Sequence, residues 1–395
     1  MSTGENELTD ALADIPFNRA AVVGRELEYV RDAIESGHTS SGGPYSRRAA
    51  DLLKEVTGAE EVLLTTSCTS ALELSALLLD LQPGDTVVVP SFTFTTTALA
   101  FVRAGARLVF CDIEPRTLGL DPAHLAELMD DRVRAVVTVH YAGVACDVEG
   151  LQKVLAGYPD VALVEDNAHA LFGTWRDQML GRIGRFATQS FHDTKNLVCG
   201  EGGALLVNDP ADVDRARVLY EKGTNRRAFL LGQVDKYSWR DTGSSFALSD
   251  VLGGYLLAQL EQRDRIQAER RRIHERYTEQ LAPVAADLDV ELAAPYAERG
   301  SAYHMFYVLL PDRDRRTAVI ERMREQGVHP AFHYVPLHSS EAGRRFSARE
   351  TECPVTDEVS SRLLRLPFYY QLGDAGVDRV VRTFTAAVRA TAPGQ

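Results

Sequence analysis

A lysine with an unusual setting lies near the middle of the chain. Lys195 follows an apolar segment at 186–191 and precedes a glycine cluster at 200–203. Glycines allow a backbone and a ligand to approach closely. Ser190 and His192 flank the end of the apolar segment at strand spacing, so both can offer hydrogen bonds on one face to an anionic group. A surface lysine in a turn is the ordinary alternative, and Lys195 alone does not decide between the two.

A carboxylate at the end of another apolar segment could be the partner of this lysine. Asp166 ends the run 161–166, which has the length and composition of a buried parallel strand. Ligands of open α/β sheets bind where the strands end. A desolvated lysine can form a Schiff base with pyridoxal 5'-phosphate (PLP), and an ionised aspartate can keep the pyridine nitrogen protonated. Asp166 could equally cap the following turn.

Two further segments have residues suited to holding such a cofactor. Cys68 and Thr69 lie in a small-residue turn between an apolar strand and a helix, where N–H groups and hydroxyls can bind a phosphate. An ordinary helix N-cap would have the same local sequence. Phe94 follows the apolar run 86–90 and could stack on a pyridine ring, although an aromatic residue there is more often core. The order of these segments along the chain favours one cofactor site.

That order resembles the DegT/DnrJ/EryC1/StrS sugar aminotransferases, a group within the fold type I PLP enzymes. The resemblance covers nearly the whole chain, and its most specific motifs are Ser190-Phe-His-Asp-Thr-Lys195-Asn with Gly200-Glu-Gly-Gly203, Glu165-Asp-Asn-Ala-His169, and Phe332-His-Tyr-Val-Pro-Leu-His338. Within the group, the segments 221–226 and 232–240 most resemble dTDP-4-amino-4,6-dideoxyhexose transaminases. Those enzymes act on dTDP-4-keto-6-deoxyglucose.

The resemblance implies a role for each matching residue. Lys195 becomes the Schiff-base lysine and proton shuttle, and Asp166 the partner of the pyridine nitrogen. The remaining cofactor residues would hold the phosphate, the ring face and the ring hydroxyl side; they are Cys68, Thr69, Ser190, His192, Phe94 and His169. The resemblance and the polar character of two segments suggest residues for the sugar nucleotide, namely Asn225, Arg226, Lys236, Tyr237, Tyr334 and His338. Each of these six could also be a solvated loop residue.

One position departs from the pattern of the family. Many relatives have a polar residue, often Asn, that reaches the cofactor phosphate across a dimer, and Ala247 occupies that position here. Ala247 has no group that could bind a phosphate. Ser244, Ser245 or the loop 222–226 could replace the contact, and the sequence does not decide between them.

The implied reaction is the transfer of an amino group from glutamate to C4 of a dTDP-linked ketosugar, giving a dTDP-4-amino-4,6-dideoxyhexose. A PLP- or PMP-dependent sugar dehydratase of the same group would have a histidine in place of Lys195. A 3-keto sugar or cyclitol aminotransferase stays open as an alternative. A PLP-fold regulator would need an additional DNA-binding segment, and a nicotinamide enzyme would show a GxGxxG motif after its first strand, which this sequence lacks.

Composition excludes several classes of partner. The chain has 395 residues and a formal net charge of −13, which disfavours nucleic acid as a ligand. Five scattered cysteines without metal-binding spacing indicate free thiols in a reducing cytoplasm. Because the sequence shows neither a signal peptide nor an apolar run of membrane-spanning length, we expect a cytoplasmic protein without a membrane partner. The resemblance further implies a homodimer or higher homo-oligomer, with the active site at the subunit interface.

Apolar runs and helical patterns alternate between about residue 60 and residue 210, which predicts an α/β fold with a mostly parallel sheet. Seven strands are expected, at 62–66, 86–90, 107–112, 133–140, 161–166, 186–191 and 203–207. We expect a polar loop at 223–246 and one long or broken helix at 252–281. Beyond it, strands are predicted at 303–310 and 330–335, and helices at 316–326, 356–365 and 374–391.

These patterns divide the chain into three parts. Residues 1–30 are expected to form an N-terminal segment, and residues 31–250 a large PLP-binding α/β domain. Residues 251–395 should contain a long linking helix and a small C-terminal α+β domain.

Overall fold

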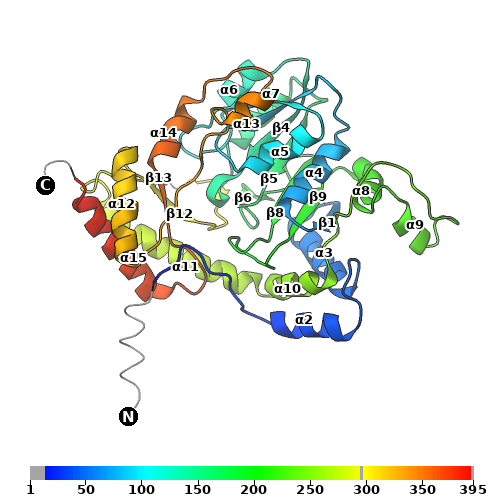
Figure 1. Ribbon diagram of the computed structural model, residues 1–395, viewed down its shortest axis with the longest axis horizontal. Helices are drawn as coiled ribbons and strands as arrows, with labels where there is room; N and C mark the ends of the chain where they lie inside the picture. The colour runs from blue at the N-terminus through cyan, green and yellow to red at the C-terminus, as the bar shows by residue number, and fades with distance from the viewer. Residues whose placement is uncertain (1–13, 294–296, 393–395) are drawn as a thin grey trace, which may run out of the picture.

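A seven-stranded sheet forms the centre of the molecule. The computed structural model describes residues 14–293 and 297–392 (Figure 1), so part of the predicted segment 1–30 lies outside the described residues. The order across the sheet is β1-β9-β8-β5-β4-β2-β3. The strands are β1 (Glu61–Thr65), β2 (Thr86–Pro90), β3 (Arg107–Cys111), β4 (Val133–Val139), β5 (Ala162–Asp166), β8 (Phe186–Ser190) and β9 (Gly203–Val207). All seven predicted strands are present, which confirms the predicted α/β class.

The sheet is parallel except at one strand. Strand β9 runs antiparallel to both of its neighbours, β1 and β8, whereas the pairs among β2, β3, β4, β5 and β8 are parallel. The strands are almost continuously apolar because helices cover both faces of the sheet. The carboxyl ends of β5 and β8 therefore lie at the same edge, which brings Asp166 and Ser190 together.

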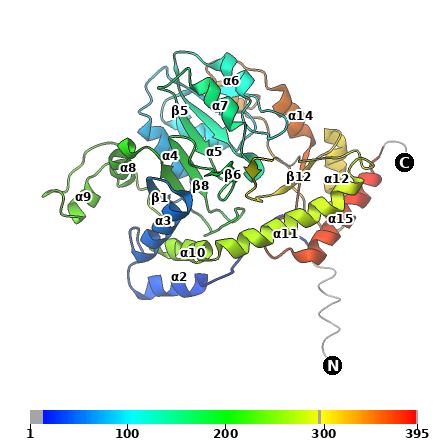
Figure 2. The same cartoon turned by 180° about the vertical axis from the view of Figure 1, so that it is seen from behind.

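Helices pack on both sides of this sheet (Figures 1 and 2). Buried apolar residues of α4 and α5 share one core with the sheet, whereas α3 and α10 contribute to the core on the other side. Short polar side chains begin several helices: Ser67, Asp121, Asp147 and Ser249 each accept a backbone N–H of the first turn. The helices are α2 (Glu26–Glu35), α3 (Pro44–Thr57), α4 (Cys68–Leu78), α5 (Thr95–Arg103), α6 (Pro122–Leu128), α7 (Val148–Leu155) and α8 (Val213–Tyr220).

Two consecutive helices connect the central sheet to the C-terminal part. Helix α10 (Asp250–Glu261) and helix α11 (Arg263–Leu281) meet at Gln262, so the predicted helix at 252–281 is a broken pair. They run along one side of the molecule from α3 towards α15 (Figure 2). Beyond them, a small sheet of order β10-β12-β13 packs with helices around a second core. Its elements are β10 (Glu291–Leu292), β12 (Phe306–Leu309), β13 (Leu363–Leu366), α12 (Arg313–Glu325), α14 (Pro354–Arg362) and α15 (Gly373–Arg389).

Three predictions for these regions were wrong in detail. Residues 330–335 do not form a strand, because only Ala331 makes a bridge there, to Arg365. The helix predicted at 356–365 ends at Arg362, and the last predicted turn belongs to strand β13. The loop predicted at 223–246 contains the short helix α9 (Arg226–Leu230), which projects from the body of the molecule (Figure 1).

Shorter elements complete the described chain. They are a sheet of β11 (Arg299–Gly300), β6 (Thr174–Trp175) and β7 (Gln178–Met179), helix α13 (Glu341–Phe346), and the 3-10 turns Tyr141–Gly143, Pro210–Asp212 and Ala282–Val284. Among the described residues, no helix combines the length and apolar character needed to cross a membrane.

Candidate active site

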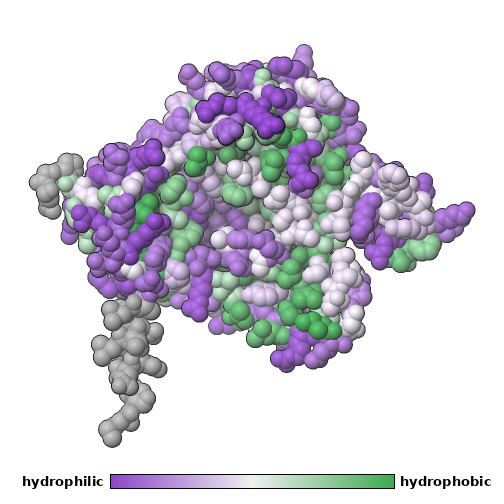
Figure 3. Space-filling view, viewed as in Figure 1, coloured by the Kyte–Doolittle hydropathy of each residue, from purple (hydrophilic) through white to green (hydrophobic). Residues whose placement is uncertain are grey.

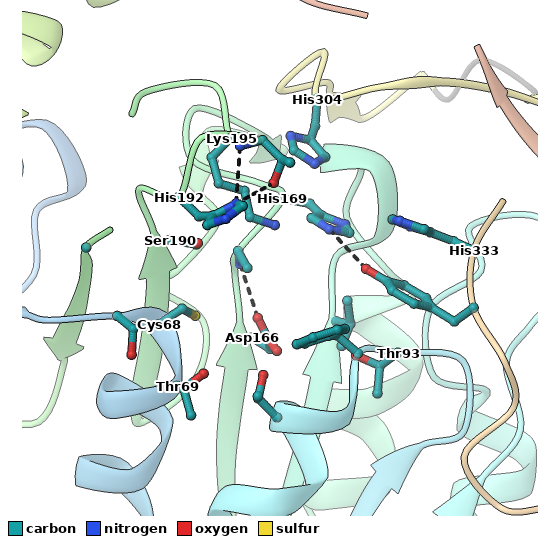
Figure 4. Close-up of a pocket in the computed structure, with 18 of the residues that line it drawn as sticks. Cys68, Thr69, Thr93, Asp166, His169, Ser190, His192, Lys195, His304 and His333 are labelled. Carbon is teal, nitrogen blue, oxygen red and sulfur yellow. Dashed lines mark hydrogen bonds between the residues drawn. The ribbon is translucent and has the colours of Figure 1, made fainter. Parts of the chain in front are cut away.

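A cavity of about 410 Å³ opens at the carboxyl ends of β5 and β8 (Figure 4). Its wall contains residues from the central sheet, from the start of α4 and from the C-terminal part. All eight residues predicted to hold the cofactor line it, together with one predicted substrate residue; these are Cys68, Thr69, Phe94, Asp166, His169, Ser190, His192, Lys195 and Tyr334. Segments far apart in the sequence thus meet in one cavity.

The amine of Lys195 is set up to be partly neutral near physiological pH. Its backbone N–H donates to the carbonyl of His192 at 2.9 Å, which fixes the turn after β8. Burial, together with the nearby charge of Arg365, lowers the pKa of Lys195 to about 8 against the opposing effects of Cys68 and Asp166. A lysine must lose its proton to act as a nucleophile, so this setting favours covalent chemistry.

Asp166 is held at the end of β5 by neighbours on both of its oxygens. Oδ2 accepts a hydrogen bond from Thr97 Oγ1 at 2.7 Å, and Oδ1 accepts the N–H of Ala168 at 3.2 Å. Thr97 is itself fixed by Thr93, whose hydroxyl lies 2.8 Å from its own. Figure 4 shows the carboxylate of Asp166 deep in the cavity. A buried carboxylate oriented in this way can fix a protonated ring nitrogen.

The residue before Asp166 stabilises the strand end from the other side. Glu165 is fully buried and accepts the backbone N–H groups of Gly181, Ile183 and Gly184 at 2.7–2.8 Å. His140 Nε2 lies 2.9 Å from the same carboxylate. Because Glu165 pairs away from the cavity, Asp166 is the carboxylate of this pair that lines it.

The first turn of α4 borders another part of the cavity. Ser67 begins this helix and accepts the N–H of Ser70 at 3.0 Å, while the hydroxyls of Thr66 and Ser67 both lie near that of Ser70. Gly203 allows β9 to lie close to the start of α4, since a Cβ at this position would overlap the backbone of Ser67. The positive end of a helix together with several hydroxyls is a suitable site for a phosphate.

Burial raises the pKa of the Cys68 thiol to about 12, and its Sγ lies 3.5 Å from Thr188 Oγ1. It is therefore a neutral packing group at neutral pH. All five cysteines are free in the structure.

His169 has one ring nitrogen available for a ligand. Its Nε2 lies 3.3 Å from the hydroxyl of Tyr334, and its ring stacks on that of His304 with centroids 4.3 Å apart. Burial and the neighbouring Lys195 hold the pKa of His169 well below its usual range, so the ring is neutral. The buried Nδ1 has no hydrogen-bond partner among the described residues. Leaving a buried polar atom unpaired costs free energy unless a ligand pairs with it.

The other predicted cofactor residues lie nearer the mouth of the cavity. Ser190 ends β8, and His192 is half exposed with its Nδ1 3.1 Å from Thr194 Oγ1. Phe94 precedes α5 and is 57% exposed, so a face of its ring is open.

Five predicted substrate residues are not in this cavity. Asn225 is buried and joins two parts of its own loop, donating to Lys236 O and accepting from Ser238 N. Arg226 forms an ion pair with Glu221, and Lys236 and Tyr237 are exposed on the same projecting loop. His338 lies elsewhere, with its Nδ1 2.7 Å from Ser91 Oγ.

The cavity also contains residues that were not singled out from the sequence. They are Phe17, Ser67, Thr93, Thr96, Val139, Ala168, Thr194, Glu201, Gly202, His304, His333 and Arg365. His333 lies inside a motif that carried the family resemblance, so that motif was a usable signal for it. Arg365 had no such signal, because it lies in the stretch that was predicted to be a helix.

The donor set of the cavity fits PLP. The amine of Lys195, the carboxylate of Asp166 and the N-terminus of α4 match the aldehyde, the pyridine nitrogen and the phosphate of this cofactor. The unpaired Nδ1 of His169 adds a polar atom for a ring substituent.

Comparison with known proteins gives a consistent result. A family model described as the DegT/DnrJ/EryC1/StrS aminotransferase family matches residues 21–385. The spore coat polysaccharide biosynthesis protein SpsC of Bacillus subtilis (strain 168) is 29% identical over 386 residues, which cover 95% of this chain and 97% of that protein.

Solved structures of aminotransferases are also similar to this chain over nearly its whole length. Aminotransferase TlmJ from Streptoalloteichus hindustanus is 31% identical with a TM-score of 0.88, covering 96% of this chain and all of that one. Sugar aminotransferase CalS13 from Micromonospora echinospora is 27% identical with a TM-score of 0.84, covering 94% of this chain and 99% of that one.

Proposed function

The chain belongs to the DegT/DnrJ/EryC1/StrS aminotransferase family, a family of PLP-dependent enzymes, and on this premise we propose a specific reaction for it. It moves an amino group from glutamate to C4 of dTDP-4-keto-6-deoxyglucose and gives a dTDP-4-amino-4,6-dideoxyhexose for deoxysugar biosynthesis. One observation carries the amino-transfer step: Lys195, with its lowered pKa, lines the same cavity as the buried carboxylate of Asp166.

Lys195 has two tasks in this reaction. Its neutral amine would hold the cofactor, and the freed amine would be the group that takes a proton from the donor carbon and later gives one back. When bound, PLP supplies the electron sink that makes this carbon acidic. A pKa of about 8 allows the amine to both accept and donate a proton near neutral pH.

The other cavity residues bind and orient. Asp166, fixed by Thr97, would keep a positive charge on the ring nitrogen, and the start of α4 would hold the phosphate. His169, whose Nδ1 is unpaired, would face the ring hydroxyl side, and Phe94 would cover one ring face. The stacked rings of His169 and His304 are neutral, so they add no charge to that side of the cavity.

Two observations support the ketosugar assignment. One is the projecting loop, and the other is that the relatives include the sugar aminotransferase CalS13 and the polysaccharide biosynthesis protein SpsC. Arg226, Lys236 and Tyr237 lie on a loop outside their own cavity, where they could contact a nucleotide bound to a second subunit. We propose a homodimer on this ground. We also propose a cytoplasmic location, which the free thiols support.

The absorption spectrum of the PLP-loaded protein tests the proposal. Glutamate should bleach the visible band of the lysine-bound cofactor, and dTDP-4-keto-6-deoxyglucose should restore it. In Lys195→Ala the protein-linked band should be absent, and its persistence would show that another lysine is the anchor. If glutamate bleaches the band and only a 3-keto sugar or a cyclitol ketone restores it, amino transfer stands and the proposed substrate is wrong.

A further inference from the structure

A buried arginine lines the cavity on the side of the C-terminal part. Arg365 lies in β13, and only 5% of the residue is exposed. Its backbone pairs with Ala331 on one side and Tyr307 on the other. Leu364 and Leu366 face the second core, so the alternation of the strand places Arg365 on the opposite face, where it reaches the cavity.

The charge of this arginine is not neutralised by the protein. Among the residues that the structure describes, no carboxylate forms a salt bridge with Arg365, and its Nε has no hydrogen-bond partner. Its Nη1 contacts the ring of His333, and the guanidinium lies 4.6 Å from the centre of the Phe17 ring. Burial and Arg365 lower the pKa of His333 to about 2, so this contact supplies no negative charge.

Two other buried arginines have a structural role, because each donates hydrogen bonds to backbone carbonyls. Arg270 donates to the carbonyls of Tyr303 and His304, and Arg316 donates to the carbonyl of Ser360. Neither lines the cavity. Arg365 differs because its unpaired donors lie at the cavity wall, where a buried cation without an anion is costly.

The missing anion is not one of the cofactor's own groups in the proposed arrangement. The phosphate would lie at the start of α4, and the ring nitrogen is assigned to Asp166. The donor of an amino-transfer reaction has a carboxylate on the carbon that bears the amine, whereas the reacting ring of the ketosugar has none. A guanidinium matches a carboxylate with two parallel hydrogen bonds.

Resting on the proposed function, we propose that Arg365 binds the carboxylate next to the reacting amine of the amino donor. It thereby places the carbon that bears this amine near Lys195, which lines the same cavity. Arg365 is a positioning residue for the donor half of the reaction and takes no part in the sugar half.

The test compares ligand binding to PLP-loaded variants. Arg365→Met removes the charge at similar length, and Arg365→Lys keeps the charge without the planar fork. The probe is glutarate, a dicarboxylate without an amine, measured by calorimetry alongside the spectroscopic dissociation constant for glutamate. Both ligands should bind about 10 to 100-fold more weakly to Arg365→Met, with Arg365→Lys intermediate, as expected for a charge-assisted hydrogen-bonded pair.

Two controls separate this role from a structural one. Arg316→Met removes another buried arginine that lies outside the cavity, and it should leave both dissociation constants unchanged. The aminated form of Arg365→Met should lose much less rate with the sugar nucleotide than the PLP form loses with glutamate. If Arg365→Met does not fold, the dissociation constants of glutarate and glutamate for Arg365→Lys and for the wild type test the same prediction.

Unchanged glutarate and glutamate binding in the Arg365 variants would overturn the proposal. A loss confined to the sugar nucleotide would overturn it too, because the anion at Arg365 would then be the diphosphate. A wild type that responds to no amino acid would instead contradict the proposed function.

Discussion

At the scale of single residues, burial determines which groups of the site carry a charge. Lys195 loses affinity for its proton because the cavity desolvates it, and Asp166 keeps its place through hydroxyl and backbone donors rather than through a cation. His169 and His304 are neutral for the same reason and can stack. The chemistry proposed for this site therefore follows from burial as much as from residue type.

The protonation of Lys195 predicts how the cofactor-free protein captures PLP. Only the neutral amine reacts, so the rate of covalent attachment should rise about tenfold per pH unit up to pH 8 and then level off. The rate levels off at this lower pH because the pKa is lowered, whereas the rate for an ordinary lysine would keep rising up to about pH 10.4. Stopped-flow absorbance between pH 6 and pH 10 measures the profile, with Nα-acetyl-lysine as the control. A midpoint equal to that of the control would contradict the desolvated setting.

At the scale of elements, the close contact between β9 and α4 should position the phosphate site. A methyl group at Gly203 would overlap the backbone of Ser67 and Cys68, so Gly203→Ala must displace the start of α4. We expect the free energy of unfolding to fall by about 1–3 kcal/mol, as for other overpacked sites, and PLP to bind more weakly. Denaturant titration and the dissociation constant of PLP measure the two effects.

Gly157→Ala is the matched control for this substitution. A Cβ there would lie 3.5 Å from the carbonyl of Val154, which is ordinary contact, so stability and PLP binding should stay near the wild-type values. Equal behaviour of the two variants would show that the approach of β9 to α4 does not shape the site.

The elements also show which parts of the fold the sequence could predict. The strands of the central sheet are separate apolar runs, and periodicity alone located them within about two residues. Strand β13 follows α14 directly in the run Ser361-Arg-Leu-Leu-Arg-Leu366, where no glycine or proline separates helix from strand. The run was therefore predicted as helix, and Arg365 was not recognised as a cavity residue.

The same limit applies to the site. Lys195, Asp166 and the start of α4 follow strands whose ends must meet at one edge, so sequence patterns could group them. Arg365 enters the cavity from β13 of the small sheet, and His304 enters it from the segment just before β12. The position of this sheet depends on the packing of α11 and α15 against it. Local patterns do not contain that information.

At the scale of the whole molecule, the unpaired apolar surface supports the proposed dimer. Leu230, Leu231 and Trp239 on the α9 loop are 68%, 63% and 82% exposed, and Leu27 on α2 is 71% exposed. Figure 3 shows apolar residues gathered on the lower part of the body, where Figure 1 places α2 and α10, and a smaller apolar group on the projection that contains α9. Apolar groups this exposed are typical of an interface between subunits.

If the α9 loop completes the cavity of a second subunit, two inactive variants should restore activity when they are mixed. Lys195→Ala lacks the amine but has an intact loop, whereas the double variant Lys236→Ala with Tyr237→Ala has the amine and a defective loop. After joint refolding, random pairing should give one working site in each mixed dimer, or about a quarter of wild-type activity. Steady-state assays of the mixture and light scattering of each variant measure this.

Mixing Lys195→Ala with Asp166→Ala is the control, because both residues line the cavity of one subunit and no pairing can combine them. Recovery with the loop variant and none with Asp166→Ala would establish a site shared between subunits. Full activity of a monomeric species would contradict it, because the loop residues lie too far from their own cavity to line it. The exposed loop would then need another explanation, since a single subunit already contains the amine, the carboxylate and the helix start that amino transfer requires.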